Sequence, residues 1–393
     1  MIIVPLTTPL HTQEVINVKT EMPALLLTQG YVFESINGKG FSNCTGNHIA
    51  NITSSNPASI SDFKKMSFGL SCQFESSVKP AWIENMNHER DKADFTQSFG
   101  LILPFKRLAI GFGFSQRYNS ILDFGKMERT TIENPEGTGE YISASESDRA
   151  TAYSCLLSYS FENATNNHDR LSLGIQCNYN QLNVKDRMFH SSLKVKTDNF
   201  GWTGGMHYQA SDRLQFGIFY ERNPVFRDRI KYQGKELLTQ IDHDPASTGN
   251  NQNMNTDLVT EINLEGKLPD KLHAGVLYKL NSFLKISFEM TRIYWNQLSD
   301  NSKNQINLSA GLTNDIAKHM SFSVGLLSTD RQYNKINYTS YKIDNKLYGL
   351  FLLIGFNLQI RSVNLDFAYV SNTDNSGEWR EQNFGKLSVG FYL

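Results

Sequence analysis

The sequence predicts an all-β fold: a transmembrane, antiparallel, up-and-down β-barrel of about fourteen strands around an N-terminal hatch, or plug. Three observations lead to this prediction. Apolar residues alternate with small or polar residues in one stretch after another from Met66 to Leu393. The segments between these stretches are mostly short and long in turn. The preceding stretch, Glu34–Phe63, is small, polar and glycine-bearing, as expected of a segment packed inside the barrel.

The composition of the 393-residue chain excludes several classes of protein. Its 38 basic and 39 acidic side chains balance, which argues against a nucleic-acid-binding surface. A membrane helix needs a run of roughly 18 to 20 apolar residues, and the sequence has none. This excludes a helical membrane protein only, because a membrane barrel carries its apolar residues in alternation and fits the mean hydropathy of -0.40.

The beginning of the chain is expected to be a flexible lead-in or an export segment of unrecognised type. Met1–Leu10 has no basic region, and Pro5 and Pro9 interrupt its short apolar run, so it is a poor signal peptide. We therefore divide the chain into a lead-in at residues 1–30, a hatch at residues 31–63 and a barrel at residues 64–393.

The predicted strands share one large apolar face and one face of Gly, Ser, Asn, Gln and Thr. Their even number is typical of bacterial membrane barrels. The strands are predicted at Met66–Phe74, Ser98–Leu103, Leu108–Ser115, Tyr153–Phe161, Leu171–Tyr179, Phe200–Gln209, Arg213–Glu221, Leu258–Leu280, Phe283–Trp295, Gln305–Asn314, His319–Thr329, Lys346–Gln359, Ser362–Val370 and Phe384–Leu393.

The connections favour a membrane barrel over a soluble sandwich. Short turns at one end and long polar loops at the other are typical of up-and-down membrane barrels. The predicted short connections are Pro104–Arg107, Ala210–Asp212, Asn281–Ser282, Asp315–Lys318 and Ile360–Arg361. The predicted long connections are Asn119–Arg149, Arg222–Asp257, Asp330–Asn345 and Ser371–Asn383.

The alternation also assigns a face to aromatic and cysteine residues. Aromatic residues near strand ends, such as Tyr179 and Trp295, are predicted to form interfacial girdles, although strand propensity alone would also place them there. Cys72, Cys155 and Cys177 fall on the outward face. Cys155 and Cys177 lie on successive strands, and we interpret them as lipid-facing side chains, with a disulfide as the alternative.

The hatch has its own turn signals and apolar residues. Gly38, Gly40 and Gly46 allow tight turns, and Asn56-Pro57 starts a turn. Its apolar residues are predicted either to line a hydrophobic ligand pocket or only to pack the hatch against the wall. The candidate ligand-binding residues are Phe33, Ile36, Phe41, Ile49, Ile52 and Phe63.

The chain carries no motif of a catalytic, cofactor or metal site. GxSxG, HExxH, P-loop and dinucleotide-binding patterns are missing, and the four cysteines have no metal-ligand spacing. We therefore predict a protein that is not an enzyme and that uses no cofactor and no metal.

Three groups of short motifs carry a resemblance to a known family. The hatch has Glu34-Ser35, Gly38, Gly40, Asn56-Pro57-Ala58 and Phe63; a central stretch has Phe200-Gly201-Trp202, Gly204-Gly205, Asp212–Gly217 and Tyr220; a later stretch has Leu268–Leu272, Ala274–Val276 and Phe288–Trp295. In order, spacing and strand number they resemble the FadL-type outer-membrane transporters for long-chain fatty acids and other hydrophobic compounds. The resemblance covers about Glu34–Leu393, and Cys44, His48 and Asn51 depart from the expected hatch pattern.

The resemblance implies a monomeric barrel in the bacterial cell outer membrane, in contact with its lipid and inserted by the barrel-assembly machinery. The ligand would be a long-chain fatty acid or another hydrophobic compound that passes by passive diffusion and leaves sideways into the membrane. The hatch residues implied in gating are Gly38, Gly40, Asn56, Pro57 and Ala58.

A fatty acid would also need a partner for its carboxylate. The inward-facing candidates are Arg117, Lys279, His207 and His273; the alternative is that these are lumen charges paired with Glu221, Glu261 or Glu289. Two other functions stay open: a porin-like channel for small polar solutes, and a structural or adhesive outer-membrane barrel that acts through its loops.

Overall fold

The computed structural model describes most of the barrel and part of the segment before it. The described residues are 16–18, 36–40, 43–46, 48–75, 96–128, 139, 141–165, 169–188, 191–233, 259–297, 303–329, 337–338, 341–342, 349–372 and 383–393. Within these ranges no helix is long and apolar enough to cross a membrane.

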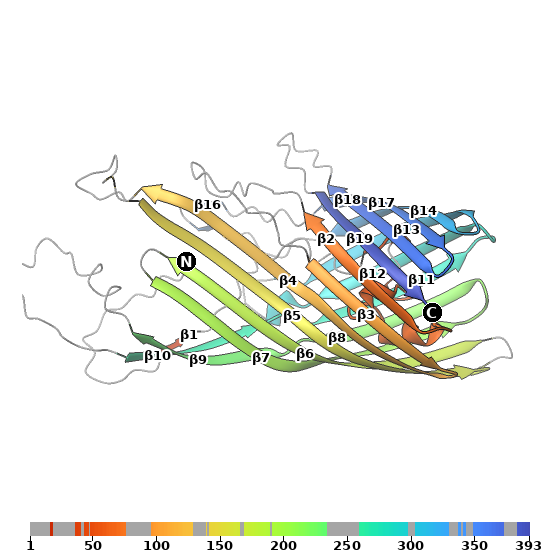
Figure 1. Ribbon diagram of the computed structural model, residues 1–393, viewed down its shortest axis with the longest axis horizontal. Helices are drawn as coiled ribbons and strands as arrows, with labels where there is room; N and C mark the ends of the chain where they lie inside the picture. Colours follow the sequence, from red (N-terminus) through yellow and green to blue (C-terminus); the bar gives the residue numbers. More distant parts are fainter. Residues whose placement is uncertain are drawn as a thin grey trace, which may run out of the picture.

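Fourteen strands of the described chain form one closed antiparallel barrel, which confirms the predicted fold class (Figure 1). Each strand pairs with the next barrel strand along the chain, and the last pairs with the first, with Leu387 opposite Cys72. The barrel strands are β2 (Ser67–Glu75), β3 (Thr96–Phe105), β4 (Leu108–Glu128), β5 (Tyr141–Glu162), β6 (Arg170–Met188), β7 (Ser191–Gln209), β8 (Leu214–Arg222), β11 (Lys271–Lys279), β12 (Leu284–Ile293), β13 (Gln305–Ala317), β14 (Met320–Thr329), β17 (Gly349–Ile360), β18 (Val363–Asn372) and β19 (Asn383–Tyr392).

The two ends of the barrel differ in their connections. At one end, which we call the turn end, residues 106–107 join β3 to β4 and residues 361–362 join β17 to β18. At the other, the loop end, the connections are longer, for example residues 330–348 between β14 and β17, with residues 189–190 between β6 and β7 as a short exception. The predicted alternation of short and long connections is therefore confirmed in outline.

The strands β4 to β7 continue well beyond the rest of the barrel at the loop end (Figure 1). The prediction that Asn119–Arg149 is a loop is therefore wrong: β4 continues to Glu128, β5 begins at Tyr141, and Asn119 pairs with Arg149. Above the membrane a strand no longer needs an apolar outward face. The apolar alternation fades there while the backbone pairing continues, so the hydrophobic pattern could not reveal these strand ends.

The predicted strand Leu258–Leu280 is also wrong, because it is two strands. β10 (Val259–Lys267) and β11 are separated by Leu268-Pro269-Asp270. Pro269 has no N–H for a ladder, and the Asp270 carboxylate accepts hydrogen bonds from the Asn223 N–H (2.9 Å) and the Tyr220 hydroxyl (3.0 Å). β10 lies outside the barrel between β9 (Val225–Gln233) and β1 (Ile16–Val18), and a second small sheet pairs β15 (Asn337–Tyr338) with β16 (Tyr341–Lys342).

The side chains of the barrel alternate between two surroundings as predicted. On β13, Ile306, Leu308 and Leu312 are exposed on the outside, whereas Asn307 and Ser309 are buried inside. This outward band of large apolar side chains is the lipid-facing surface of a membrane barrel. Cys155 and Cys177 are exposed on it and lie directly opposite each other, and both are free thiols.

The described residues between Ile36 and Phe63 contact the inward-facing backbone of the wall. The segment contains two short 3-10 helices, η2 (Ile49–Asn51) and η3 (Pro57–Asp62). A methyl group added to Gly174 or Gly205 would overlap with Asn56–Ala58, and one added to Gly217 would overlap with Cys44. Further wall glycines that would meet the segment in the same way are Gly69, Gly100, Gly113, Gly275, Gly355 and Gly390.

These wall glycines are neighbours across the barrel. Gly390, Gly69, Gly100 and Gly113 stand opposite one another in a row across β19, β2, β3 and β4. Gly174 is opposite Gly205, and Gly217 is opposite Gly275. The wall is therefore thinnest where the segment passes, and we call residues 36–63 the hatch from here on.

Two adjacent glycines of β7 allow a matched test of this packing. An alanine at Gly205 would place its methyl group on the Asn56 Oδ1 atom, whereas an alanine at Gly204 would meet only the Trp202 ring at 3.4 Å. We expect Gly205→Ala to lower the free energy of unfolding by about 1–3 kcal/mol, as overpacking does, and Gly204→Ala to change it little. Denaturant unfolding of the barrel, followed by tryptophan fluorescence, measures both; equal effects would contradict the packing.

Candidate ligand channel

Buried acidic side chains of the wall hold the first part of the hatch. Asp366 on β18 accepts a hydrogen bond from the Gly38 N–H and one from the Asn357 side chain (3.0 Å). The His48 Nε2 atom lies 3.3 Å from Oδ2 of the same carboxylate, the oxygen that also accepts from Asn357, and both side chains are buried. Thr313 on β13 donates to the Lys39 carbonyl at 3.0 Å. Asp366 therefore joins two separate points of the hatch to the wall.

Glu289 on β12 makes a second attachment. Its carboxylate accepts the Cys44 N–H at 2.8 Å and the Asn43 side-chain amide at 3.4 Å. Burial raises the pKa of the Cys44 thiol, and the Glu289 carboxylate raises it further. Cys44 is therefore a protonated, buried thiol at neutral pH, a form that reacts slowly with electrophiles.

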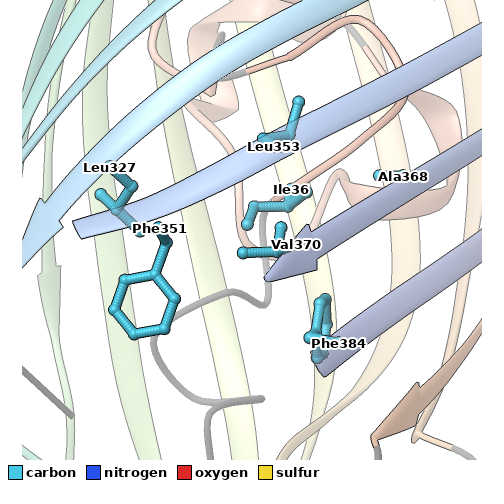
Figure 2. Packing of buried hydrophobic residues seen from close by; sticks show 7 residues of the cluster. All are labelled: Ile36, Leu327, Phe351, Leu353, Ala368, Val370 and Phe384. Atoms are coloured by element: carbon cyan, nitrogen blue, oxygen red, sulfur yellow. The ribbon is translucent and has the colours of Figure 1, made fainter. Parts of the chain in front are cut away.

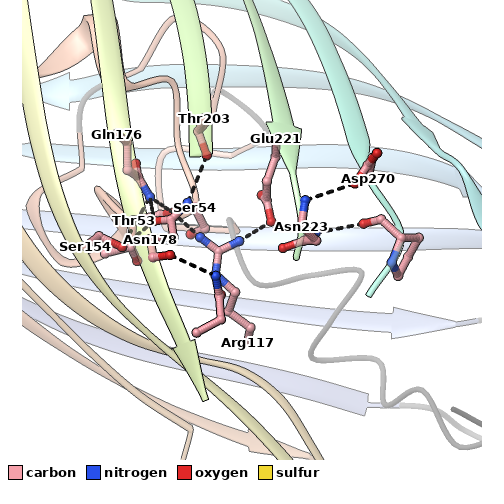
Figure 3. A network of polar contacts seen from close by, with 12 residues as sticks. Thr53, Ser54, Arg117, Ser154, Gln176, Asn178, Thr203, Glu221, Asn223 and Asp270 are labelled. Atoms are coloured by element: carbon pink, nitrogen blue, oxygen red, sulfur yellow. Dashed lines mark hydrogen bonds and ion pairs between the residues drawn. The ribbon is translucent and has the colours of Figure 1, made fainter. Parts of the chain in front are cut away.

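A polar network attaches the middle of the hatch to the opposite wall (Figure 3). Arg117 on β4 forms a buried ion pair with Glu221 on β8 and donates through Nη2 to the Thr53 carbonyl at 3.0 Å. Gln176 on β6 donates to the same carbonyl at 2.9 Å and to the Asn178 side chain at 2.6 Å. A β-bulge between Gln116 and Tyr118 leaves Arg117 out of the ladder, which is how bulges commonly redirect a side chain.

The end of the hatch is held by a third charged group. Asp62 forms an ion pair with Arg170 on β6, and the His207 Nδ1 atom lies 3.5 Å from its second oxygen. Hydroxyl groups of the wall add neutral bonds, from Ser158 to the Ala58 carbonyl at 2.9 Å and between Ser61 and Ser172 at 2.8 Å. Residues 36–46 are thus attached to β12, β13 and β18, and residues 50–62 mainly to β3–β7.

The five residues predicted to take part in gating all lie where the hatch meets the wall. Gly38 has no room for a side chain, because a Cβ atom there would lie 2.7 Å from the Phe367 carbonyl oxygen. Gly40 has φ of 89°, the left-handed conformation that favours glycine. Asn56 accepts the Ala58 N–H at 3.0 Å and donates to the Met206 carbonyl of β7 at 2.8 Å. Pro57 and Ala58 lie against Gly174. Their role in gating stays a prediction.

The predicted ligand-binding residues fall into two separate apolar clusters. Ile49, Ile52 and Phe63 pack with Ile60, Ile102, Ala109 and Leu156 in what we call the turn-side cluster. Ile36 packs elsewhere, against wall residues near the loop end of β14 and β17–β19, and Figure 2 shows these side chains gathered there. Phe33 and Phe41 lie outside the described residues. We call the second cluster the loop-side patch: Ile36, Leu327, Phe351, Leu353, Ala368, Val370 and Phe384.

The four candidates for carboxylate binding have different surroundings. Arg117 has a carboxylate partner within the protein, Glu221, which is the alternative that the sequence left open. His207 is buried beside Asp62. His273 stacks on Phe219, with ring centroids 4.1 Å apart, and its Nδ1 atom is 2.9 Å from the Thr291 hydroxyl. Lys279 is the last residue of β11, at the turn end. Ligand binding by any of them stays a prediction.

Sequence reasoning missed how acidic residues hold the hatch: it named Glu289 as a possible partner of lumen cations, and it did not name Asp366 or Asp62. Glu289 and Asp366 occupy inward positions of strands whose other inward residues are small or polar, such as Ser287 and Asn364. A carboxylate at such a position is the signal that would have found them, because it needs a buried partner. Asp62 had no such signal, since it lies in the hatch.

These features define a class of protein: a closed fourteen-stranded barrel whose lumen holds an N-terminal segment between polar anchors and an apolar patch. Solved structures of the same architecture are known. A FadL homologue from Pseudomonas aeruginosa matches with a TM-score of 0.58 and 14% identity, over 90% of this chain and 96% of that one. The Ralstonia pickettii toluene transporter TbuX matches with a TM-score of 0.61 and 12% identity, over 91% of this chain and 99% of that one.

The P. putida toluene transporter TodX matches similarly, with a TM-score of 0.59 and 11% identity, over 91% of this chain and 97% of that one. No family model and no curated protein sequence matches the chain. The chain therefore shares the fold of the FadL-type channels, at sequence identities that show the fold alone.

The Arg117–Glu221 pair allows a double-mutant test of the polar network. Arg117→Gln or Glu221→Gln alone would leave one buried charge without compensation, which costs about 3–5 kcal/mol of stability. The double variant removes both charges and should recover most of that loss. Denaturant unfolding of the four proteins measures the coupling, and additive losses would contradict a direct pair.

Cys44 provides a reporter of hatch position. In a Cys72→Ser/Cys155→Ser/Cys177→Ser variant it is the single thiol, and its side chain is fully buried in the native state. We expect a water-soluble maleimide to label it at neutral pH only after denaturation, because it is both inaccessible and protonated. Rapid labelling of the folded protein would show that the first part of the hatch is not seated against β12.

Proposed function

We propose that this protein is an outer-membrane channel through which hydrophobic small molecules, such as long-chain fatty acids or related hydrocarbons, enter a Gram-negative bacterium by passive diffusion. The single observation that carries the proposal is the loop-side patch. It is an apolar surface inside a lumen whose described wall residues are otherwise mostly polar, and it lies near the long loops.

The patch suits an apolar ligand on physical grounds. Phe351, Leu353 and Val370 point inward from adjacent strands and are buried inside the barrel. Among the described residues of the hatch, Ile36 is the apolar side chain in this cluster. An apolar molecule in the same place would gain about 25 cal/mol for each Å² that it removes from water.

The comparisons support this class of ligand. The similar structures include two proteins described as toluene transporters and one described as a monoaromatic hydrocarbon channel, CymD. We propose a ligand of the same chemical class, recognised through its apolar surface. Because Arg117 already pairs with Glu221, recognition of a carboxylate would be secondary to burial of the hydrocarbon part.

We further propose that the hatch controls passage. A ligand that occupies the loop-side patch competes with Ile36 for the same surface, and displacement of Ile36 would pull on the Gly38–Asp366 attachment. Release sideways into the membrane would keep an apolar molecule out of water, and nothing in the sequence suggests an energy source or a catalytic site.

Two buried leucines provide a matched test. Leu353 belongs to the loop-side patch and Leu156 to the turn-side cluster, and both side chains have 0% exposure. We expect Leu353→Gln to lower the uptake rate of a labelled long-chain fatty acid or of toluene about tenfold, since a lost apolar contact of this size is worth about 1.5–3 kcal/mol. Leu156→Gln should destabilise the barrel similarly but leave uptake by the folded protein close to that of the wild type.

The comparison separates a binding surface from damage to the fold. Folded barrel is quantified for each variant by its faster migration in unheated samples on denaturing gels. Uptake by Leu353→Gln equal to that of the wild type would contradict the loop-side patch as the ligand surface. Loss in Leu156→Gln alone would move the ligand surface to the turn-side cluster, which contains three of the residues predicted from the sequence.

A further inference from the structure

The outward face of β4–β7 carries an aromatic row that marks the edge of the membrane. Phe114, Tyr153, Tyr179 and Phe200 stand directly opposite one another on the four strands. Their ring centroids are 5.2, 6.4 and 5.2 Å apart in that order, and Phe200 is 65% exposed. Exposed aromatic side chains such as Tyr153 and Phe200 are typical of the boundary between lipid tails and headgroups.

Basic residues lie beyond this row on the same face. Arg149, Lys185 and Lys196 are each an even number of residues from the aromatic residue of their own strand, on its loop-end side, and therefore share its outward face. Arg149 and Lys196 both stand opposite Asn183 of β6. Lys185 and Lys196 are exposed. We call Arg149, Lys185 and Lys196 the basic face.

The distance from the aromatic row places the basic face at headgroup depth. Four residues separate Tyr153 from Arg149 and Phe200 from Lys196, which is about 14 Å along a strand at ~3.4 Å per residue, and six residues separate Tyr179 from Lys185, which is about 20 Å. With the tilt of about 40° that barrel strands have, these distances are roughly 10 Å and 16 Å along the membrane normal. The basic face therefore lies above the lipid tails and level with charged headgroups.

The charge of this region favours an anionic partner. Among the described outward positions of β5–β7 above the aromatic row, Asp198 is the one acidic side chain, beside Lys196 on β7. Three basic side chains against one acidic side chain leave a net positive face.

We propose that the basic face binds the phosphate groups of anionic glycolipid in the outer leaflet. The proposal rests on the outer-membrane location proposed above, since the loop end of such a barrel faces outward. Lysine ammonium groups pair with phosphate as point charges, and arginine can pair with two of its oxygens at once. The phosphates of the glycolipid would bind the basic face, and its lipid chains would lie on the aromatic row and the apolar wall below.

The test is retention of lipid by the purified full-length barrel in neutral detergent. The probe is lipid A with both phosphates, compared with the same lipid after removal of the phosphates, and bound lipid is quantified by mass spectrometry. We expect saturable binding of the phosphorylated lipid. We expect a roughly 25-fold weaker affinity in Lys185→Gln/Lys196→Gln, because each basic side chain near an anionic surface strengthens binding about fivefold.

A matched control removes two exposed basic residues at the turn end, Arg213 and Lys318. Arg213→Gln/Lys318→Gln should retain the phosphorylated lipid as the wild type does. Equal retention by Lys185→Gln/Lys196→Gln and the wild type, or equal binding of both lipid forms to the wild type, would overturn the proposal. Migration of unheated protein on gels confirms that each variant is folded.

Fatty-acid uptake by the same variants separates this inference from the proposed function. We expect Lys185→Gln/Lys196→Gln to keep its uptake, because neither residue lies in the lumen. A wild-type protein that retains lipid but takes up no hydrophobic compound would refute the channel and leave the basic face standing. A protein that takes up hydrophobic compounds but retains no lipid would refute the basic face alone.

Discussion

The close contact between the hatch backbone and the glycines of the wall is the constraint on which the rest of the structure depends. A barrel of this many strands encloses more space than its own inward side chains need fill. Here Gly174 and Gly205 leave room for Asn56–Ala58, and Gly217 and Gly275 leave room for Cys44. A larger side chain at any of these positions would meet the hatch backbone, so wall and hatch must fit each other.

The polar attachments follow from the same arrangement. A segment of small polar residues placed inside a barrel leaves backbone N–H and C=O groups that need partners. Asp366 and Glu289 accept N–H groups from the first part of the hatch, and Arg117 donates to a carbonyl in its middle. The charge of Arg117 is balanced by Glu221 rather than by the hatch. The hatch is thereby bonded to opposite sides of the wall, which fixes its position across the lumen.

This arrangement accounts for a lumen with two kinds of surface. Polar bonds attach the hatch to β4–β8 and, through Glu289 and Asp366, to β12 and β18. The loop-side patch on β14 and β17–β19 differs, because among the described residues of the hatch it includes one apolar side chain, Ile36. The polar contacts are directional and therefore fix one position of the hatch in the lumen. The contact of Ile36 with the loop-side patch is not directional, so another apolar molecule can replace it. A binding surface for hydrophobic compounds and a closed lumen are therefore compatible in one barrel.

Much of the fold could be predicted from the sequence, because lipid outside and hatch inside impose a period of two on every strand at membrane depth. The same reasoning failed where that constraint ends. β4 and β5 continue through residues 119–128 and 141–149, where the apolar alternation is lost, and Leu258–Leu280 keeps an alternating pattern across the break at Pro269. The hydrogen bonds that attach the hatch to the wall could not be predicted from the sequence, because Asp366 lies 328 residues from Gly38 and no local pattern pairs them.

The site was predicted in part for the same reason. The sequence identified Arg117 as an inward-facing charge and Glu221 among its alternative partners, because strand parity settles which side chains point inward. It grouped Ile36 with Ile49, Ile52 and Phe63, because they are close in the chain. In three dimensions the hatch separates Ile36 from the other three, and the wall decides which apolar residues join each cluster.

The most direct test of the account is the ion conductance of the barrel in a planar lipid bilayer, with and without residues 34–63. The account predicts that the whole protein conducts little, because the hatch fills the lumen, and that the folded deletion variant opens a large, steady pore. Equal conductance of the two folded proteins would contradict the claim that this segment closes the barrel.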